Sequence, residues 1–112
     1  ENIQEIFESL EKDESDWTIK HLNILKKKSP TSMAVALKQL KLAKIMNLKD
    51  CLSMEFRICQ AMMSKNDFYE GVRANLVDKD RSPNWKPKSV FDLTSNIVDE
   101  HFLELNDKEL FN

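Results

Sequence analysis

The sequence predicts an all-α protein built from about five or six short amphipathic helices. The chain of 112 residues contains one glycine and three prolines, whereas a sheet-rich fold of this length would need more glycine for its tight turns. Apolar residues recur at the three- and four-residue spacing of helices with one buried face. No strand pattern, internal repeat or low-complexity stretch is evident. Residues 1–112 are therefore expected to form one helical region, either a domain or a piece of a larger one.

The first two helices are expected near the start of the chain. In the first, apolar residues follow the spacing i, i+3, i+4, i+7: Ile3, Ile6, Phe7 and Leu10. Polar residues at 12–15 end it, and Ser15 or Asp16 can cap the free amides of the second helix. The apolar side of the second helix carries one tryptophan and two leucines: Trp17, Leu22 and Leu25. Lysines 26–28 would close it, because cations are favoured at a helix C-terminus.

The strongest helix-start signal is the pair Ser29-Pro30, since serine can cap a helix and proline fits its first turn. The third helix should stop near Asn47. Its apolar residues are Met33, Ala36, Leu37, Leu40, Ala43 and Ile45. A fourth helix is expected from Leu48 to about Asn66, which suits a C-cap. Its apolar residues are Leu52, Phe56, Cys59 and Met63.

The last part of the sequence predicts a helix, a loop and a final helix. Asp67 is expected to cap the fifth helix, whose apolar residues are four apart: Phe68, Val72 and Leu76. Residues 79–87 are predicted as a loop, because prolines and polar residues interrupt the periodicity. Thr94 is expected to cap a last helix. This helix would contain Ile97, Val98, His101, Phe102 and Leu105.

Composition excludes several classes of function. The formal net charge of −2 lacks the basic excess of a dedicated nucleic-acid-binding protein. No apolar run approaches the roughly 20 residues that cross a bilayer, and no secretory signal is recognised. Cys51 and Cys59 lie about 12 Å apart along one predicted helix. This distance is too long for a disulfide, so we expect two reduced, buried thiols in an intracellular or organellar compartment.

The sequence shows no recognisable catalytic or metal-binding motif. One glycine cannot build a phosphate-binding loop, and the ligand spacings typical of zinc sites are absent. His21 and His101 lie in predicted amphipathic helices and are expected to be partly exposed. We therefore expect no catalytic residue, no metal and no covalently bound cofactor in this chain.

One stretch, 67–86, combines features of a nucleotide site. It carries four cations: Arg73, Lys79, Arg81 and Lys86. Trp85 adds an aromatic ring. Cations suit phosphate groups, and a flat ring or guanidinium suits a base. The alternative for Trp85 is that it anchors the loop to the body of the protein.

Five segments of the chain also match a known family in order and spacing. They are Lys28-Ser29-Pro30-Thr31-Ser32, Met54-Glu55-Phe56-Arg57, Asn66-Asp67-Phe68-Tyr69-Glu70-Gly71-Val72-Arg73-Ala74, Leu76-Val77-Asp78-Lys79-Asp80 and Pro83-x-Trp85-x-Pro87. Together they resemble the C-terminal region of 3-hydroxyisobutyryl-CoA hydrolases in the crotonase (enoyl-CoA hydratase/isomerase) superfamily. The resemblance covers nearly the whole chain.

The resemblance implies the C-terminal helical part of a crotonase-like fold without its ββα spiral core. It implies an enzyme of valine catabolism in the mitochondrial matrix, which hydrolyses 3-hydroxyisobutyryl-CoA to the free acid and CoA. In this family the catalytic carboxylates lie in the missing N-terminal core, as do the backbone N–H groups that stabilise charge on the thioester oxygen. The chain alone is therefore expected to be inactive, and its partners would be that core and the acyl-CoA substrate.

The resemblance also bears on binding and association. A lysine of the C-terminal loop contacts CoA in the wider superfamily, and Lys79 fits this position best. Arg81 and Trp85 join it as CoA-binding candidates from the residues themselves. Without the core, surplus apolar surface should make the chain self-associate, with contacts from Met54, Phe56 or Met62. Two alternatives remain: a free-standing helical interaction module, and a CoA-binding module without chemistry.

Overall fold

The computed structural model describes residues 2–111, and these residues form six α-helices and no strand. In chain order they are α1 (Ile3–Lys12), α2 (Asp16–Leu25), α3 (Pro30–Ala43), α4 (Leu48–Met63), α5 (Asn66–Val72) and α6 (Ser95–Asp99). A π-helical turn extends α5, and three short 3-10 turns follow: Arg73–Val77, then Val90–Asp92, Glu100–Phe102 and Asn106–Lys108. The predicted all-α class is confirmed.

Three predicted helix caps are confirmed. The side-chain oxygens of Ser15, Ser29 and Thr94 each accept a hydrogen bond from the backbone amide three residues later. Proline also occupies the first turn of α3. These contacts satisfy amides that have no partner inside the helix, so the helix starts follow from local sequence.

The boundary between α4 and α5 differs from the prediction. α4 ends at Met63, and Asn66 is the first residue of α5 rather than a C-cap. Lys65 precedes α5 and makes no side-chain cap, so the prediction that Asp67 caps this helix is wrong. Asp67 instead lies inside α5 and is buried. Its carboxylate accepts hydrogen bonds from two distant donors, the Ser29 hydroxyl and the backbone amide of Lys86.

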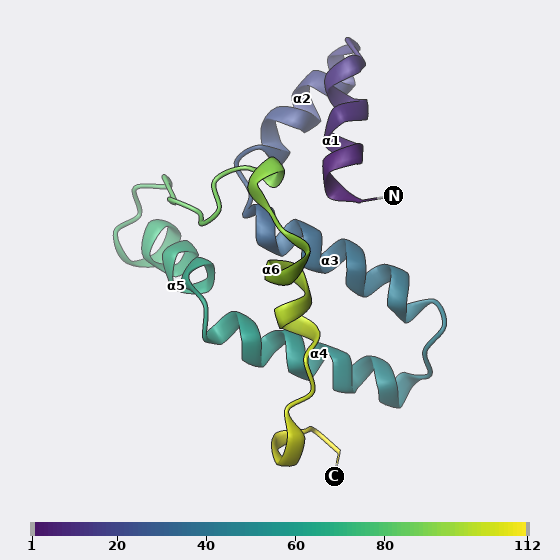
Figure 1. The fold of residues 1–112 in the computed structure, drawn as a ribbon. Coiled ribbons are helices and arrows are strands. Elements are labelled where there is room, and N and C mark those ends of the chain that lie inside the picture. The colour runs from purple at the N-terminus through teal and green to yellow at the C-terminus, as the bar shows by residue number, and fades with distance from the viewer. Residues whose placement is uncertain (1, 112) are drawn as a thin grey trace.

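The helices form an open layer rather than a ball (Figure 1). α1 and α2 make a hairpin at one end, α3 and α4 run in opposite directions across the middle, and the C-terminal segment crosses them. The Cα radius of gyration is 15.6 Å, whereas a compact domain of this length would have about 13 Å. The molecule measures 49 × 36 × 22 Å, so its shortest dimension is about two helix diameters.

The core is small for the length of the chain. Its main cluster lies between α1, α2, α3 and the segment at 90–93: Phe7, Leu22, Ala34, Val90 and Leu93. Many large apolar side chains remain exposed, among them Leu40, Leu48, Leu52, Met63, Phe68, Leu76, Val77 and Leu103. None of the helices among residues 2–111 has both the length and the apolar character to cross a membrane.

Several burial predictions are wrong, because helical spacing defines a face but does not say what covers it. Trp17, assigned to the buried side of α2, is 64% exposed. His101, expected to be partly exposed, is 1% exposed. Cys51 is half-buried and Cys59 exposed, although both are free thiols as predicted. Met54 is 3% exposed and therefore cannot contribute to a surface contact.

Candidate ligand-binding site

A basic pocket of about 650 Å³ lies where the C-terminal end of α2 meets the loop after α5. Five of its lining side chains are cations, and none is acidic: Lys26, Lys27, Lys28, Arg81 and Lys88. Trp85 lines the same pocket and supplies an aromatic ring. The pocket therefore combines positive charge and a flat ring, the two features that a nucleotide-like ligand requires.

The structure brings two of the three predicted CoA-binding residues together. Arg81 and Trp85 both line the pocket, whereas Lys79 is exposed and is not among the lining residues. Lys79 and Arg81 both have left-handed backbone conformations, with φ of 57° and 59°. This region costs a non-glycine residue about 1–2 kcal/mol. Other contacts must therefore hold the loop in this shape.

Trp85 anchors the loop to two distant elements. Its indole Nε1 donates a hydrogen bond to the carbonyl oxygen of Lys27, at 2.9 Å. The edge of the ring lies over Gly71, where an added Cβ would stand 3.3 Å from the Cη2 atom. The anchoring role proposed for Trp85 is thus observed alongside its place in the pocket wall. Gly71 permits this approach because it has no side chain.

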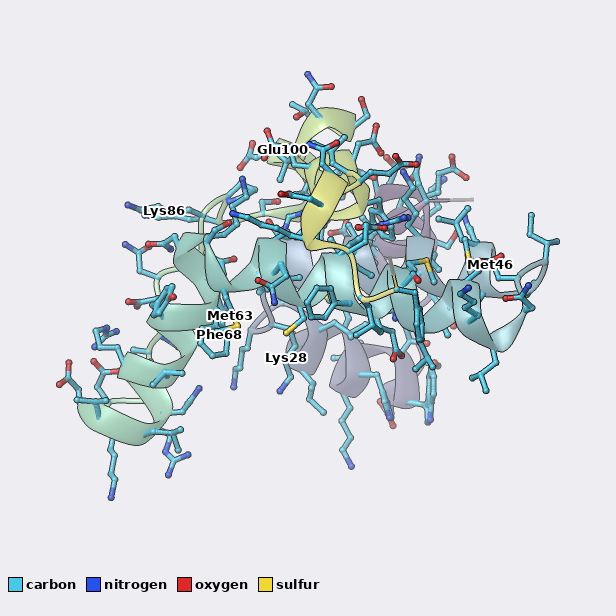
Figure 2. All side chains as sticks on the ribbon, turned by 90° about the horizontal axis from the view of Figure 1, so that it is seen from below. Lys28, Met46, Met63, Phe68, Lys86 and Glu100 are labelled. Atoms are coloured by element: carbon cyan, nitrogen blue, oxygen red, sulfur yellow. The ribbon has the colours of Figure 1, made fainter. Side chains whose placement is uncertain are left out.

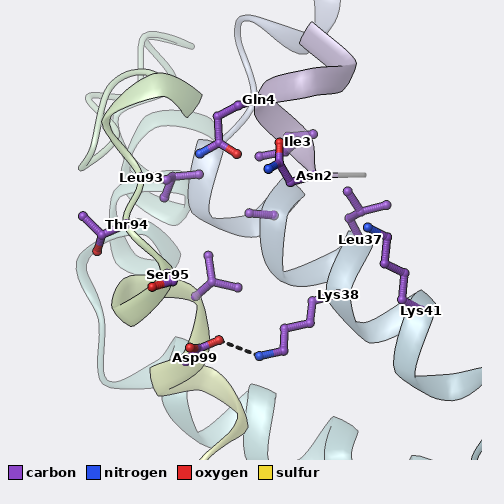
Figure 3. Close-up of a pocket in the computed structure, with 12 residues that line it drawn as sticks. Asn2, Ile3, Gln4, Leu37, Lys38, Lys41, Leu93, Thr94, Ser95 and Asp99 are labelled. Carbon is purple, nitrogen blue, oxygen red and sulfur yellow. Dashed lines mark hydrogen bonds and ion pairs between the residues drawn. The ribbon is translucent and has the colours of Figure 1, made fainter.

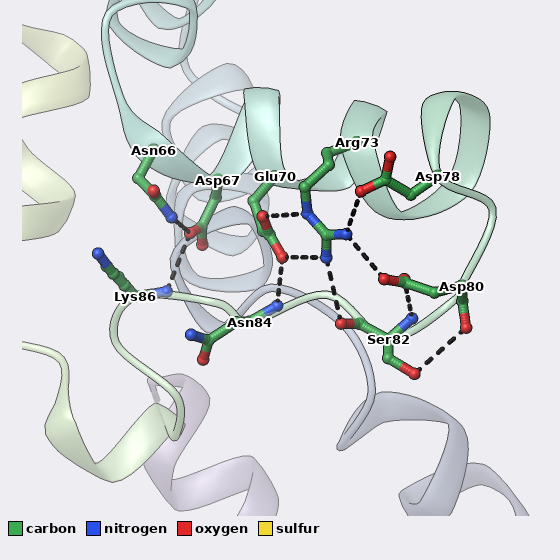
Figure 4. A network of polar contacts seen from close by, with 9 residues as sticks. All are labelled: Asn66, Asp67, Glu70, Arg73, Asp78, Asp80, Ser82, Asn84 and Lys86. Carbon is green, nitrogen blue, oxygen red and sulfur yellow. Dashed lines mark hydrogen bonds and ion pairs between the residues drawn. The ribbon is translucent and has the colours of Figure 1, made fainter.

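Arg73 is the centre of a network of carboxylates beside the pocket (Figure 4). Its guanidinium donates to Glu70 at 2.7 and 2.8 Å, to Asp78 at 2.9 Å and to Asp80 at 2.7 Å. These bonds raise the pKa of Arg73. Together with the amide of Asn84, Arg73 lowers the pKa of Glu70 from 4.5 to about 2. Arg73 is therefore neutralised within the chain and is not available to bind a phosphate.

The carboxylates of α5 also hold the backbone of the loop. Glu70 accepts a hydrogen bond from the Asn84 amide at 2.7 Å, and Asp67 accepts one from the Lys86 amide at 2.9 Å. Asp67 also accepts the Ser29 hydroxyl at 2.6 Å, which links the loop to the start of α3. Asp67 and Glu70 are three residues apart and so share one face of α5. The three-residue spacing of Asp67 and Glu70 was the signal in the sequence that these two carboxylates act on the same loop.

Lys26–Lys28 belong to the site, although they were not predicted to. From the sequence, these lysines were predicted only to end the second helix, because cations are favoured at a helix C-terminus. The structure places them in one pocket with Arg81 and Lys88. The run of three lysines directly before Ser29-Pro30 was the only available signal.

A second pocket of about 490 Å³ lies between the start of α1, α3 and α6 (Figure 3). It is largely apolar, with Ile3, Leu37, Leu93 and Val98 in its wall. Lys38 and Asp99 form an ion pair at its edge.

Both histidine side chains contact the backbone of their own helical segment. The Nδ1 atoms of His21 and His101 each lie within hydrogen-bonding distance of the carbonyl four residues earlier, Trp17 and Ile97 respectively. Within residues 2–111, no three His, Cys, Asp or Glu side chains are arranged to hold a metal ion. The basic pocket is thus the feature of the described residues that best suits a ligand.

Comparison with known proteins points to one family. A family model described as enoyl-CoA hydratase/isomerase matches residues 1–102. Curated relatives include the mitochondrial 3-hydroxyisobutyryl-CoA hydrolases of Xenopus laevis, 43% identical over 108 residues, and Homo sapiens, 41% identical over 108 residues. The corresponding protein of Dictyostelium discoideum is 46% identical over 112 residues. The matches cover 96–97% of this chain but only 28–29% of those relatives.

Two solved structures share the fold. An enoyl-CoA hydratase from Rhodobacter sphaeroides superposes with a TM-score of 0.91 at 26% identity, over 100% of this chain and 34% of its own. A carnitinyl-CoA dehydratase from Mycobacterium thermoresistibile gives a TM-score of 0.87 at 27% identity, over 98% of this chain and 31% of its own. Both are CoA enzymes by name, and this chain spans about a third of each.

Proposed function

The chain belongs to the enoyl-CoA hydratase/isomerase family, and we propose that it is the C-terminal helical part of a hydrolase that cleaves 3-hydroxyisobutyryl-CoA to 3-hydroxyisobutyrate and CoA. The observation that carries this proposal is 41–43% identity, over 96% of the chain, to vertebrate enzymes of that name. Their names also include "mitochondrial". The mitochondrial matrix and valine catabolism follow as parts of the proposal.

The chemistry of this reaction would come from outside the chain. Thioester hydrolysis requires hydrogen-bond donors aimed at the developing oxyanion, often backbone N–H groups. The chain has one glycine, and Gly71 lies in α5 under the ring of Trp85. The described part of the chain thus offers no evident oxyanion-binding loop, and we propose that the catalytic groups lie in an N-terminal core.

The proposed structural role of the helices is to cover that core. The layer is only 22 Å thick, and it leaves large apolar side chains of α3, α4 and α5 uncovered. An exposed apolar surface of this extent is typical of an interface. In isolation, the same surface would make the chain self-associate.

The proposed contact with substrate is through the CoA end. Arg81 would approach a phosphate and Trp85 the adenine, from the wall of the basic pocket. Lys79 remains a proposed CoA ligand at the adjacent turn, as the family resemblance implies. The chain would therefore bind the carrier, whereas the missing core would bind and cleave the acyl group.

A thiol-release assay with 3-hydroxyisobutyryl-CoA tests the proposal. It should be run on the 112-residue chain and on the whole protein that contains it. We expect free CoA from the whole protein only. Turnover by the 112 residues would show that the catalytic groups lie in this chain. Silence from both would favour the second candidate, a helical interaction module, for which the exposed apolar side chains are the supporting observation.

A further inference from the structure

Among residues 2–111, the cations of the basic pocket form no ion pair. The five cations are Lys26, Lys27, Lys28, Arg81 and Lys88. No described carboxylate pairs with any of them, although carboxylates do pair with Lys38, Arg57, Lys65 and Arg73. Arg73, just beside the pocket, binds three carboxylates. The three carboxylates outnumber Arg73 and leave a net negative charge beside the pocket, whereas the five cations that line the pocket itself stay unpaired.

One carbonyl group at the end of α2 is also satisfied within the chain. The carbonyl groups at a helix C-terminus carry partial negative charge and would oppose a bound anion. At the end of α2, the carbonyl oxygen of Lys27 accepts the Trp85 indole N–H. Trp85, which lines the pocket, thus reduces the negative charge that this carbonyl group presents to a bound anion.

The charge pattern limits the class of ligand. One exposed ion pair contributes little to binding, so a singly charged anion would gain little from exposed lysines. Several cations around one concavity act together and attract a multiply charged ligand. A CoA thioester carries a diphosphate and a 3′-phosphate at its nucleotide end, which meets this requirement.

We propose that Lys26, Lys27, Lys28 and Lys88 form a phosphate-binding subsite for the nucleotide end of CoA. This inference rests on the proposed function, in which Arg81 and Trp85 contact CoA, and it adds four lysines from two other segments. The three lysines that follow α2 would bind phosphate from one side of the pocket, and Arg81 would bind it from the loop after α5.

The test measures the affinity of the whole protein for CoA by titration calorimetry, with the variant Lys26→Gln/Lys27→Gln/Lys28→Gln. We expect the dissociation constant to rise about tenfold, which corresponds to 1.4 kcal/mol. Lys88→Gln should give a smaller rise in the same direction. A matched variant, Lys12→Gln/Lys20→Gln/Lys44→Gln, removes three exposed lysines elsewhere and should change the dissociation constant less than twofold.

A phosphate-free substrate separates binding from folding. KM for the pantetheine thioester of 3-hydroxyisobutyrate should be unchanged in the triple lysine variant, whereas KM for the CoA thioester should rise. Equal rises for both substrates would overturn the subsite. So would unchanged CoA affinity in this variant. If Arg81→Gln weakens CoA binding while the lysine variants do not, the proposed CoA contact stands and the lysine subsite fails. If none of these variants changes the affinity, both fail.

Discussion

Glu70 holds the loop of the basic pocket through two kinds of contact. It pairs with Arg73 in the π-helical turn that extends α5, and it accepts a hydrogen bond from the backbone amide of Asn84 across the loop. These hydrogen bonds lower the pKa of Glu70 to about 2. Because both contacts need the ionised carboxylate, the shape of the loop is linked to the protonation of this residue.

The first prediction is a loss of loop structure at acid pH. The folded-state pKa of Glu70 lies below its ordinary value of 4.5, so its stabilising effect is complete above about pH 4.5 and is lost as pH falls toward 2. The pKa of Asp80 is lowered in the same sense by Arg73 and the Ser82 amide. We expect the NMR signal of the Trp85 indole N–H to shift over this range.

Two variants test the assignment to Glu70. Glu70→Gln keeps the shape of the side chain but cannot ionise, and it should displace the Trp85 signal already at pH 7. It should also reduce the acid-induced change. Glu8→Gln, an exposed glutamate of α1, should leave the titration of Trp85 unchanged. A native titration curve in Glu70→Gln would contradict this prediction.

The second prediction concerns Gly71. Alanine normally stabilises a helix relative to glycine by about 1 kcal/mol. At this position the added Cβ would lie 3.3 Å from the Trp85 ring, and the Lys27 carbonyl limits how far the ring can move. We expect Gly71→Ala to destabilise the protein by about 1 kcal/mol, because overpacking exceeds the helical gain. Urea unfolding measures this change.

In the control, Gly71→Ala should change the free energy of unfolding in the opposite direction. In a Trp85→Ala background the contact is absent, so Gly71→Ala should stabilise the protein by about 1 kcal/mol. The same sign in both backgrounds would show that Trp85 is not the obstacle.

At the scale of elements, Asp67 and Ser29 connect α5 to the start of α3. The Ser29 hydroxyl donates to Asp67 at 2.6 Å, while its oxygen also accepts the Ser32 amide that begins α3. Asp67 in turn holds the Lys86 amide. One buried carboxylate thus joins two helices and the loop.

The third prediction follows from this link. Asp67→Ala leaves the Ser29 hydroxyl and the Lys86 amide without their partner, so we expect a loss of about 2–3 kcal/mol in the free energy of unfolding. Ser29→Ala should cost more than Thr94→Ala, because Thr94 is a helix cap without such a distant contact. A cap alone contributes about 1 kcal/mol.

A double-mutant cycle separates the link from the cap. In an Asp67→Ala background, Ser29→Ala should cost no more than an ordinary cap. Additive effects of the two substitutions would mean that the hydrogen bond contributes nothing to stability. Urea unfolding of the four proteins gives the result.

At the scale of the whole molecule, the main feature is apolar surface that the chain cannot cover. Met63 and Phe68 are both about half exposed, at 49% and 46%. Met63 ends α4 and Phe68 lies in the first turn of α5, so both belong to the region where the two helices meet (Figure 2). Phe56 and Met62, which were predicted as contact residues, are only partly exposed, whereas Met54 is buried.

The fourth prediction is that the 112-residue chain alone self-associates. Light scattering should detect species larger than a monomer as the concentration rises, because burial of apolar surface drives association. Met63→Ser/Phe68→Ser should reduce this association, whereas Gln60→Ser, an exposed polar position of α4, should not. A monomer at high concentration that binds no hydrophobic dye would contradict the prediction.

Part of the candidate site is recognisable in the sequence. Arg81 and Trp85 are predicted because a cation and an aromatic ring in one loop suggest a nucleotide-like ligand, and both line the pocket. Lys79 has the same chemistry as the pocket lysines but is not among the lining residues. Lys26–Lys28 could not be assigned, since nothing in their own segment indicates the loop that they meet.

The sequence by itself determined the helical class and most helix starts. These depend on hydrogen bonds and side-chain spacing within a few residues, as at Ser15, Ser29 and Thr94. Only the tertiary structure decided which helix faces are buried and where the pocket forms. The bond from Trp85 to Lys27 joins residues 58 apart, and local periodicity carries no information about a contact at that distance.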